Sequence, residues 1–118
     1  MAEYTIYHNP RCSKSRQTLT LLEEKGVVPE VVLYLETPPD AAQIESLLRQ
    51  LNIDARSLLR KGEEEHRALG LADSELGESE LIGAMAANPR LIERPIVVSG
   101  NRAVLGRPPE NVLQLLDD

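Results

Sequence analysis

The stretch Tyr4-Thr5-Ile6-Tyr7-His8-Asn9-Pro10-Arg11-Cys12-Ser13 decides the fold of this chain of 118 residues. Its first four residues predict a short strand, Tyr4–Tyr7, and Asn9-Pro10 predicts the loop that ends it. From Ser13 to Lys25 leucines recur at helical spacing, and Gly26 is a suitable stop for that helix. The apolar run Val31–Leu35 then predicts a second strand, buried on both faces as in a parallel pair. Strand, helix and strand in about thirty residues form a βαβ unit.

The rest of the chain predicts a block of helices followed by a β-hairpin and a last helix. Asp40 and Gln43 have the spacing of a capping box, at the start of a helix with the apolar stripe Ile44, Leu47, Leu48 and Leu51. The other expected elements are helices at Ala55–Leu59, Glu63–Leu69 and Glu78–Asn88, strands at Pro95–Ser99 and Arg102–Leu105 joined by Gly100-Asn101, and a helix from Pro108. This order predicts an α/β fold of thioredoxin-like type, with a mixed four-stranded sheet. We expect one domain over residues 1–118, with a helical insertion at about residues 40–90.

Composition excludes several classes of function. A net charge of −6 and an aromatic content of 3% argue against a nucleic-acid surface, and the same charge argues against binding to an anionic membrane. No apolar run could span a bilayer, and no signal peptide follows Met1, so we expect a cytoplasmic protein. One cysteine and two histidines without metal-ligand spacing predict no metal site. Because no feature demands a dimer, we expect a monomer.

Cys12 is the candidate nucleophile because it lies between a strand end and a helix start. Helix N-termini carry partial positive charge and free N–H groups, both of which favour a thiolate and bind anions. Four basic residues, His8, Arg11, Lys14 and Arg16, lie near it, and no acidic residue occurs between residues 4 and 22. We therefore expect the pKa of Cys12 to lie below the free value of about 8.5. The alternatives are a buried structural cysteine and, for His8, a simple turn residue.

The spacing around Cys12 argues against two known cysteine motifs. A phosphatase loop requires an arginine six positions after the cysteine, where this chain has Thr18. A dithiol redox motif requires a second cysteine three positions on, where this chain has Ser15. Any two-electron redox cycle must therefore use a thiol from outside the chain.

The segment from Tyr7 to Arg16 resembles the active-site motif of the glutaredoxin-linked, glutathione-dependent arsenate reductases. The resemblance continues, in the same order, through Leu33–Pro39, Leu58–Lys61, Arg94–Val98 and Arg107-Pro108. It implies a thioredoxin-like fold and an oxidoreductase of arsenical resistance, with no metal and no bound organic cofactor.

The same resemblance implies a role for five residues. Cys12 would attack arsenate and form a covalent thiolate–arsenic intermediate, and His8 would help to keep Cys12 ionised. Arg60, Arg94 and Arg107 would hold the oxyanion, which agrees with the planar, permanently charged forks of donors that arginine provides. Glutathione would attack the intermediate, arsenite would leave, and glutaredoxin would remove the glutathione from the mixed disulfide.

The sequence also carries an expectation for Arg94 and leaves two alternative functions open. Arg94 precedes Pro95, at the position where thioredoxin-like folds place a cis-proline facing the active-site cysteine. The residues alone favour a solvated surface group for each of the three arginines, and the resemblance reverses that interpretation. The Cys12-x-x-Ser15 pattern also suits a monothiol glutathione-dependent thiol transferase. An interaction protein of the polymerase-binding regulator type is the third hypothesis, with Glu63-Glu64-Glu65 as its partner surface or simply as a solvated helix face.

Overall fold

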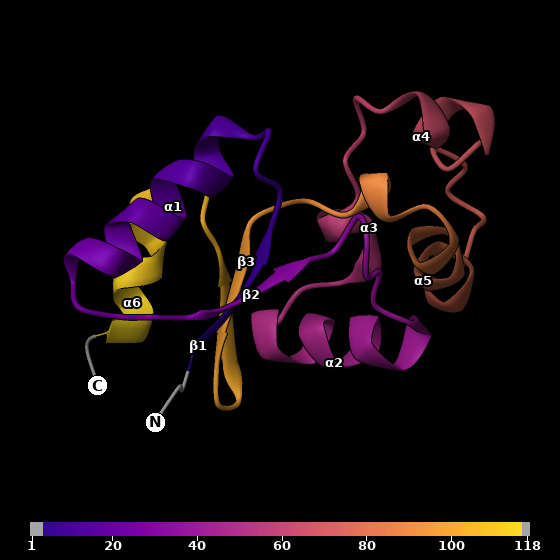
Figure 1. The fold of residues 1–118 in the computed structure, drawn as a ribbon. Coiled ribbons are helices and arrows are strands. Elements are labelled where there is room, and N and C mark those ends of the chain that lie inside the picture. Colours follow the sequence, from indigo (N-terminus) through magenta and orange to yellow (C-terminus); the bar gives the residue numbers. More distant parts are fainter. Residues whose placement is uncertain (1–3, 117–118) are drawn as a thin grey trace. The chain divides into compact units, whose positions relative to one another are not determined.

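The computed structural model describes residues 4–116 and divides the chain into two compact units (Figure 1). Met1–Thr37 together with Arg94–Asp118 form the first, which we call the sheet unit. Pro38–Glu93 form the second, which we call the helical unit. One domain over residues 1–118, with a helical insertion at about residues 40–90, stays a prediction.

The sheet unit contains four strands in the order β2-β1-β3-β4. Its elements are β1 Tyr4–His8, α1 Ser13–Glu24, β2 Glu30–Leu33, β3 Ile96–Ser99, β4 Arg102–Leu105, the 3-10 helix η2 Pro109–Val112 and α6 Leu113–Leu116. Strands β1 and β2 are parallel, whereas β1 with β3 and β3 with β4 are antiparallel. The mixed four-stranded sheet and the thioredoxin-like order are therefore confirmed, as is the hairpin at Gly100-Asn101.

The expectation for the second strand was wrong in one respect. β2 is not buried on both faces, because the side chain of Val31 is 44% exposed. It ends at Leu33, and Tyr34 and Leu35 lie in the turn that follows. The physical reason is its place in the sheet: β2 is an edge strand, and in the sheet it pairs only with β1.

One face of the sheet is covered by α1, η2 and α6. Figure 1 shows α1 and α6 next to each other in this unit, and their buried apolar side chains meet the sheet. The core cluster consists of Ile6, Leu22, Val97, Val112 and Leu115. Because side chains alternate along a strand, His8 lies on the same face of β1 as Ile6. The strand thereby directs His8 towards the first turn of α1.

The helical unit is built from α2 Ala41–Leu51, α3 Ala55–Leu58, α4 Glu64–Ala68, α5 Glu78–Ala87 and the 3-10 helix η1 Pro89–Leu91. The capping box of α2 is confirmed: the Gln43 N–H donates to the Asp40 carboxylate at 2.8 Å, and the Asp40 N–H donates to the Gln43 side chain at 2.9 Å. α2 packs on α5 through its buried stripe. Within residues 4–116, no helix is both long and apolar enough to cross a membrane.

Candidate active site at Cys12

Cys12 occupies the N-cap of α1, and only 8% of it is exposed. Its N–H donates to the Asn9 carbonyl at 3.0 Å, and its own carbonyl accepts the N–H of Arg16 at 3.0 Å. The N–H of Arg11 donates to the Asn9 side chain at 3.0 Å, which is the local bonding that favours asparagine in turns. These hydrogen bonds hold the Asn9-Pro10 loop in a turn and fix Cys12 at the N-terminus of α1.

The surroundings of Cys12 lower its pKa. Burial is the largest single effect and acts the other way, because it disfavours the thiolate. The N–H of Ser15, the charge of Arg94, the N–H of Lys14 and the charge of Arg107 together outweigh burial, and the pKa is lowered. The direction agrees with the sequence-based expectation, but the charges come from Arg94 and Arg107 rather than from the basic residues nearby in the sequence.

Arg16 explains why nearness in the sequence was misleading. Its Nη1 donates to the carbonyl of Pro10 at 2.8 Å, so its guanidinium group holds the loop. A residue four positions after Cys12 lies on about the same face of α1, but this guanidinium group is directed at the Pro10 carbonyl. Lys14 acts on the thiol through its backbone N–H.

Arg107 places its guanidinium group within contact distance of the thiol. Its Nη1 lies 3.9 Å from Cys12 Sγ and 3.3 Å from the carbonyl oxygen of Arg94. The Arg94-Pro95 peptide bond is cis, as expected from the sequence, and the Arg107-Pro108 bond is cis as well, which was not foreseen. Two X-Pro segments therefore bring Arg94 and Arg107 to the same thiol.

Gly106 allows these segments to approach α1 closely. Its N–H donates to the carbonyl of Pro95 at 2.9 Å, and its carbonyl accepts the hydroxyl of Thr18 at 3.3 Å. A Cβ atom at this position would lie 2.5 Å from Thr18 Oγ1 and 2.9 Å from Pro95 Cγ. No local signal in the sequence marks the contact of Thr18 with Gly106.

His8 and Ser15 form a buried pair beneath the loop. His8 Nδ1 lies 2.7 Å from Ser15 Oγ, which also accepts the N–H of Asn9 at 3.0 Å. Burial, and secondarily the charge of Arg16, lowers the pKa of His8, so the ring is neutral at neutral pH. His8 Nδ1 and the Ser15 hydroxyl share one hydrogen bond, in which the tautomer of the ring decides which of the two donates. Sequence reasoning used Ser15 to exclude a dithiol motif and to suggest a monothiol one, but it missed the contacts of this residue with His8 and Asn9.

Arg60, the third arginine of the resemblance, belongs to the helical unit. Its backbone N–H donates to the Leu91 carbonyl at 2.7 Å. Its Nη1 lies 2.6 Å from a carboxylate oxygen of Glu63, and its Nε lies 3.5 Å from one of Glu93. Glu63 also lies 3.6 Å from the guanidinium group of Arg90. The structure therefore brings Cys12, Arg94 and Arg107 together in the sheet unit, and shows Arg60 engaged by carboxylates of its own unit.

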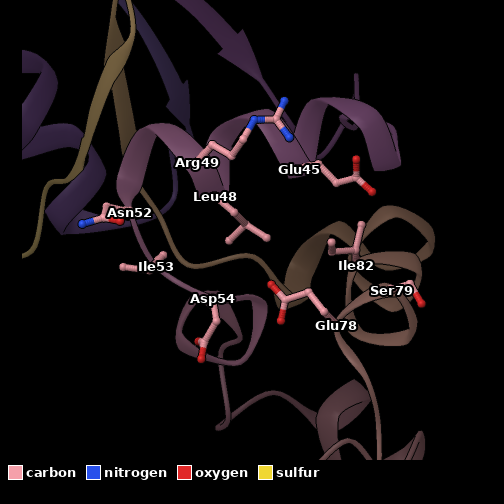
Figure 2. Close-up of a pocket in the computed structure, with 9 residues that line it drawn as sticks. All are labelled: Glu45, Leu48, Arg49, Asn52, Ile53, Asp54, Glu78, Ser79 and Ile82. Atoms are coloured by element: carbon pink, nitrogen blue, oxygen red, sulfur yellow. The ribbon is translucent and has the colours of Figure 1, made fainter.

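The helical unit also has a hollow of about 680 Å³ between α2 and α5 (Figure 2). Figure 2 shows the apolar side chains of Leu48 and Ile82 within it, and the Glu78 side chain turned towards α3. One oxygen of Glu78 accepts the N–H of Ala55 at 2.8 Å, so this acid caps α3. No residue of the sequence-predicted site lines the hollow. Among residues 4–116, no three His, Cys, Asp or Glu side chains are grouped to hold a metal ion.

The geometry at Cys12 fits a nucleophile that meets an anion. A lowered pKa increases the thiolate fraction of Cys12, and the arginines at the site provide fixed positive charge for oxygen atoms. Because a thiolate and an anionic substrate repel each other, this charge is what such a reaction requires.

Comparison with known proteins points to one family. The model described as the ArsC family matches residues 7–115. An uncharacterised protein of Escherichia coli K12, YfgD, is 60% identical over 94% of this chain and 94% of its own length. An arsenate reductase of Neisseria meningitidis is 44% identical over 98% of this chain and all of its own. The solved structure of an arsenate reductase from Vibrio cholerae has a TM-score of 0.92 and 50% identity, over 94% of this chain and 95% of that one.

Proposed function

Since this chain belongs to the ArsC family, we propose that it reduces arsenate to arsenite, with glutathione as co-substrate and glutaredoxin as protein partner. The observation that carries the proposal is the 3.9 Å approach of Arg107 Nη1 to Cys12 Sγ, at a thiol whose pKa is lowered. The names of the relatives from Neisseria and Vibrio support the substrate. Glutathione and glutaredoxin follow from the sequence motif and from the single cysteine of the chain.

The first step forms a bond between sulfur and arsenic. The Cys12 thiolate attacks the arsenic of arsenate, and one arsenate oxygen takes up protons and leaves as water. Arg94 and Arg107 hold the remaining oxygens and stabilise the negative charge that develops on them. Arg60 contributes a third guanidinium group in this proposal. Arsenic is still in the +5 state after this step.

The second step is the reduction, and it consumes an external thiol. A glutathione thiolate attacks the Cys12 sulfur, so that an S–S bond forms as the S–As bond breaks. The electron pair of the broken bond stays on arsenic, which becomes arsenic(III) and leaves as arsenite. A glutaredoxin thiolate then attacks the glutathione sulfur of the mixed disulfide and frees the Cys12 thiolate.

The test of this proposal is arsenate turnover by the purified chain with glutathione and glutaredoxin. We expect activity in the unmodified protein and none in Cys12→Ser, which lacks the nucleophile. Absence of turnover by the unmodified protein with several glutaredoxins would overturn the proposal.

A monothiol thiol transferase is the second candidate, because the Cys12-x-x-Ser15 pattern also suits disulfide exchange. Arg60→Ala separates the two functions. For an arsenate reductase, the variant loses arsenate turnover and keeps the exchange of glutathione with a small mixed disulfide. An equal loss of both activities would contradict an oxyanion role for Arg60.

A further inference from the structure

Thr18 is a buried polar residue of α1 whose hydroxyl contacts a segment outside its own helix. The residue is fully buried, and its hydroxyl donates to the carbonyl of Lys14 at 2.8 Å and to that of Gly106 at 3.3 Å. A hydroxyl has one hydrogen to donate, so the two carbonyls share it. The bond to Lys14 stays within α1, whereas the bond to Gly106 joins α1 to the segment that follows β4.

Gly106 belongs to the segment that carries Arg107, which it directly precedes. The N–H of Gly106 donates to the carbonyl of Pro95 at 2.9 Å, and Arg107 Nη1 donates to the carbonyl of Arg94 at 3.3 Å. Through Thr18, the same short segment is also bonded to α1. A shift of Gly106 relative to α1 would therefore move the Arg107 guanidinium group relative to the thiol.

The thiol belongs to the other side of this contact, because Cys12 is the N-cap of α1. Thr18 lies six residues after Cys12, or about 9 Å further along the helix axis at about 1.5 Å per residue. This distance is too long for a contact between the Thr18 hydroxyl and the sulfur. Any influence of Thr18 on the thiol must therefore pass through the groups that its side chain holds.

We infer that Thr18 is a positioning residue: its hydroxyl fixes the Gly106-Arg107 segment against α1 and thereby keeps the Arg107 guanidinium group 3.9 Å from Cys12 Sγ. Because the attraction between charges falls with distance, a small displacement of Arg107 weakens its hold on the thiolate. The effect on the thiol needs no substrate, whereas the effect on arsenate turnover rests on the proposed function.

The test replaces the hydroxyl of Thr18 by a methyl group. Thr18→Val keeps the shape of the side chain but leaves the Gly106 carbonyl without this donor. We expect the thiolate absorbance of Cys12 to appear at higher pH, and kcat/KM for arsenate at neutral pH to fall about threefold to tenfold, the range for one hydrogen bond. Thr18→Ser retains the hydroxyl and should titrate like the unmodified protein.

The matched control is Thr20→Val, the same substitution at an exposed threonine of the same helix, which should change neither measurement. A side chain that only filled space would tolerate valine, so an unchanged titration in Thr18→Val would overturn the inference. An equal change in Thr18→Val and Thr18→Ser would also overturn it, because the hydroxyl would then play no part.

A double-mutant cycle separates positioning from a general loss of structure. In an Arg107→Ala protein, Thr18→Val should lose most of its effect on the titration, because the group that it positions is gone. An equal effect with and without Arg107 would overturn the inference. Gly106→Ala gives the same test without a change at Thr18, since its Cβ atom would lie 2.5 Å from Thr18 Oγ1 and displace the segment.

The titration and the turnover fail separately. A titration that moves as expected, in a protein that never turns over arsenate, would overturn the proposed function and support the role of Thr18. Arsenate turnover with an unchanged titration in Thr18→Val would overturn the role of Thr18 and leave the proposed function standing.

Discussion

The sheet unit and the helical unit hold their predicted oxyanion-binding arginines in opposite electrostatic settings. In the sheet unit, Arg107 Nη1 contacts the Cys12 sulfur and a carbonyl oxygen, and the charge of Arg107 lowers the pKa of the thiol. In the helical unit, Arg60 lies against the carboxylates of Glu63 and Glu93. Arginines that a motif marks alike therefore differ in their contacts, because one guanidinium group is directed at the Cys12 sulfur and the other lies against two carboxylates.

The largest effect that sharpens this comparison is expected for Arg107→Ala. Loss of the charge next to Sγ raises the pKa of Cys12, so the thiolate fraction at neutral pH falls and the pH–rate profile moves to higher pH. Loss of a donor to the oxyanion adds to this, and kcat/KM for arsenate should fall about a hundredfold or more. The thiolate absorbance during a pH titration, together with steady-state kinetics, measures both effects. Arg11→Ala is the control, and an equal rise of the pKa in that protein would contradict the assignment to Arg107.

The next effect concerns stability, and it contrasts a close-packed glycine with an open one. Gly106→Ala forces a Cβ atom against Thr18 and Pro95 and should lower the free energy of unfolding by about 1–3 kcal/mol. Gly83→Ala lies in α5, with no atom within 4 Å of its Cβ, and should raise it by about 0.5–1 kcal/mol. Denaturant unfolding of both proteins measures the difference. Equal free energies of unfolding in the two variants would show that the backbone at Gly106 can shift away from Thr18 and Pro95 without loss of stability.

The smallest effect is expected for Glu63→Gln, which removes one of the charges that compensate Arg60. If Arg60 holds arsenate, this variant should lower the KM for arsenate by about twofold to fivefold, the range for a partly exposed ion pair. Glu64→Gln, on an exposed neighbour in α4, should leave the KM unchanged. A KM that does not change in Glu63→Gln would mean that the carboxylate does not compete with the substrate for Arg60.

Much of the fold was predictable because its signals are local. The capping box at Asp40, the hairpin at Gly100 and the junction at Cys12 each depend on residues close together in the sequence. The exposure of Val31 was not predictable, because it depends on where β2 lies in the sheet. A run of apolar residues indicates a strand but does not tell how many neighbours it has.

The site divides in the same way. Cys12 was identified from its neighbours, and its lowered pKa was expected from them. The charges that lower this pKa were not predicted. Arg94 and Arg107 lie more than 80 positions after Cys12 in the sequence, and only the fold brings them to the thiol. In the sequence, Ser15 was noted because a second cysteine is absent there, and Thr18 because an arginine is absent there. Their contacts with His8 and with Gly106 leave no pattern in the sequence.

The hydroxyl of Ser15 has a consequence for attempts to redesign this chain. A self-sufficient version would need its second sulfur at position 15, and that position is fully buried and already joins His8 to the backbone of Asn9. Sulfur is a weaker hydrogen-bond partner than oxygen. Ser15→Cys would therefore supply a second thiol but weaken the hydrogen bonds to His8 and Asn9 that hold the loop. In the proposed reaction, the need for an outside thiol and the bonding that holds the loop before Cys12 are thus two results of the same oxygen atom.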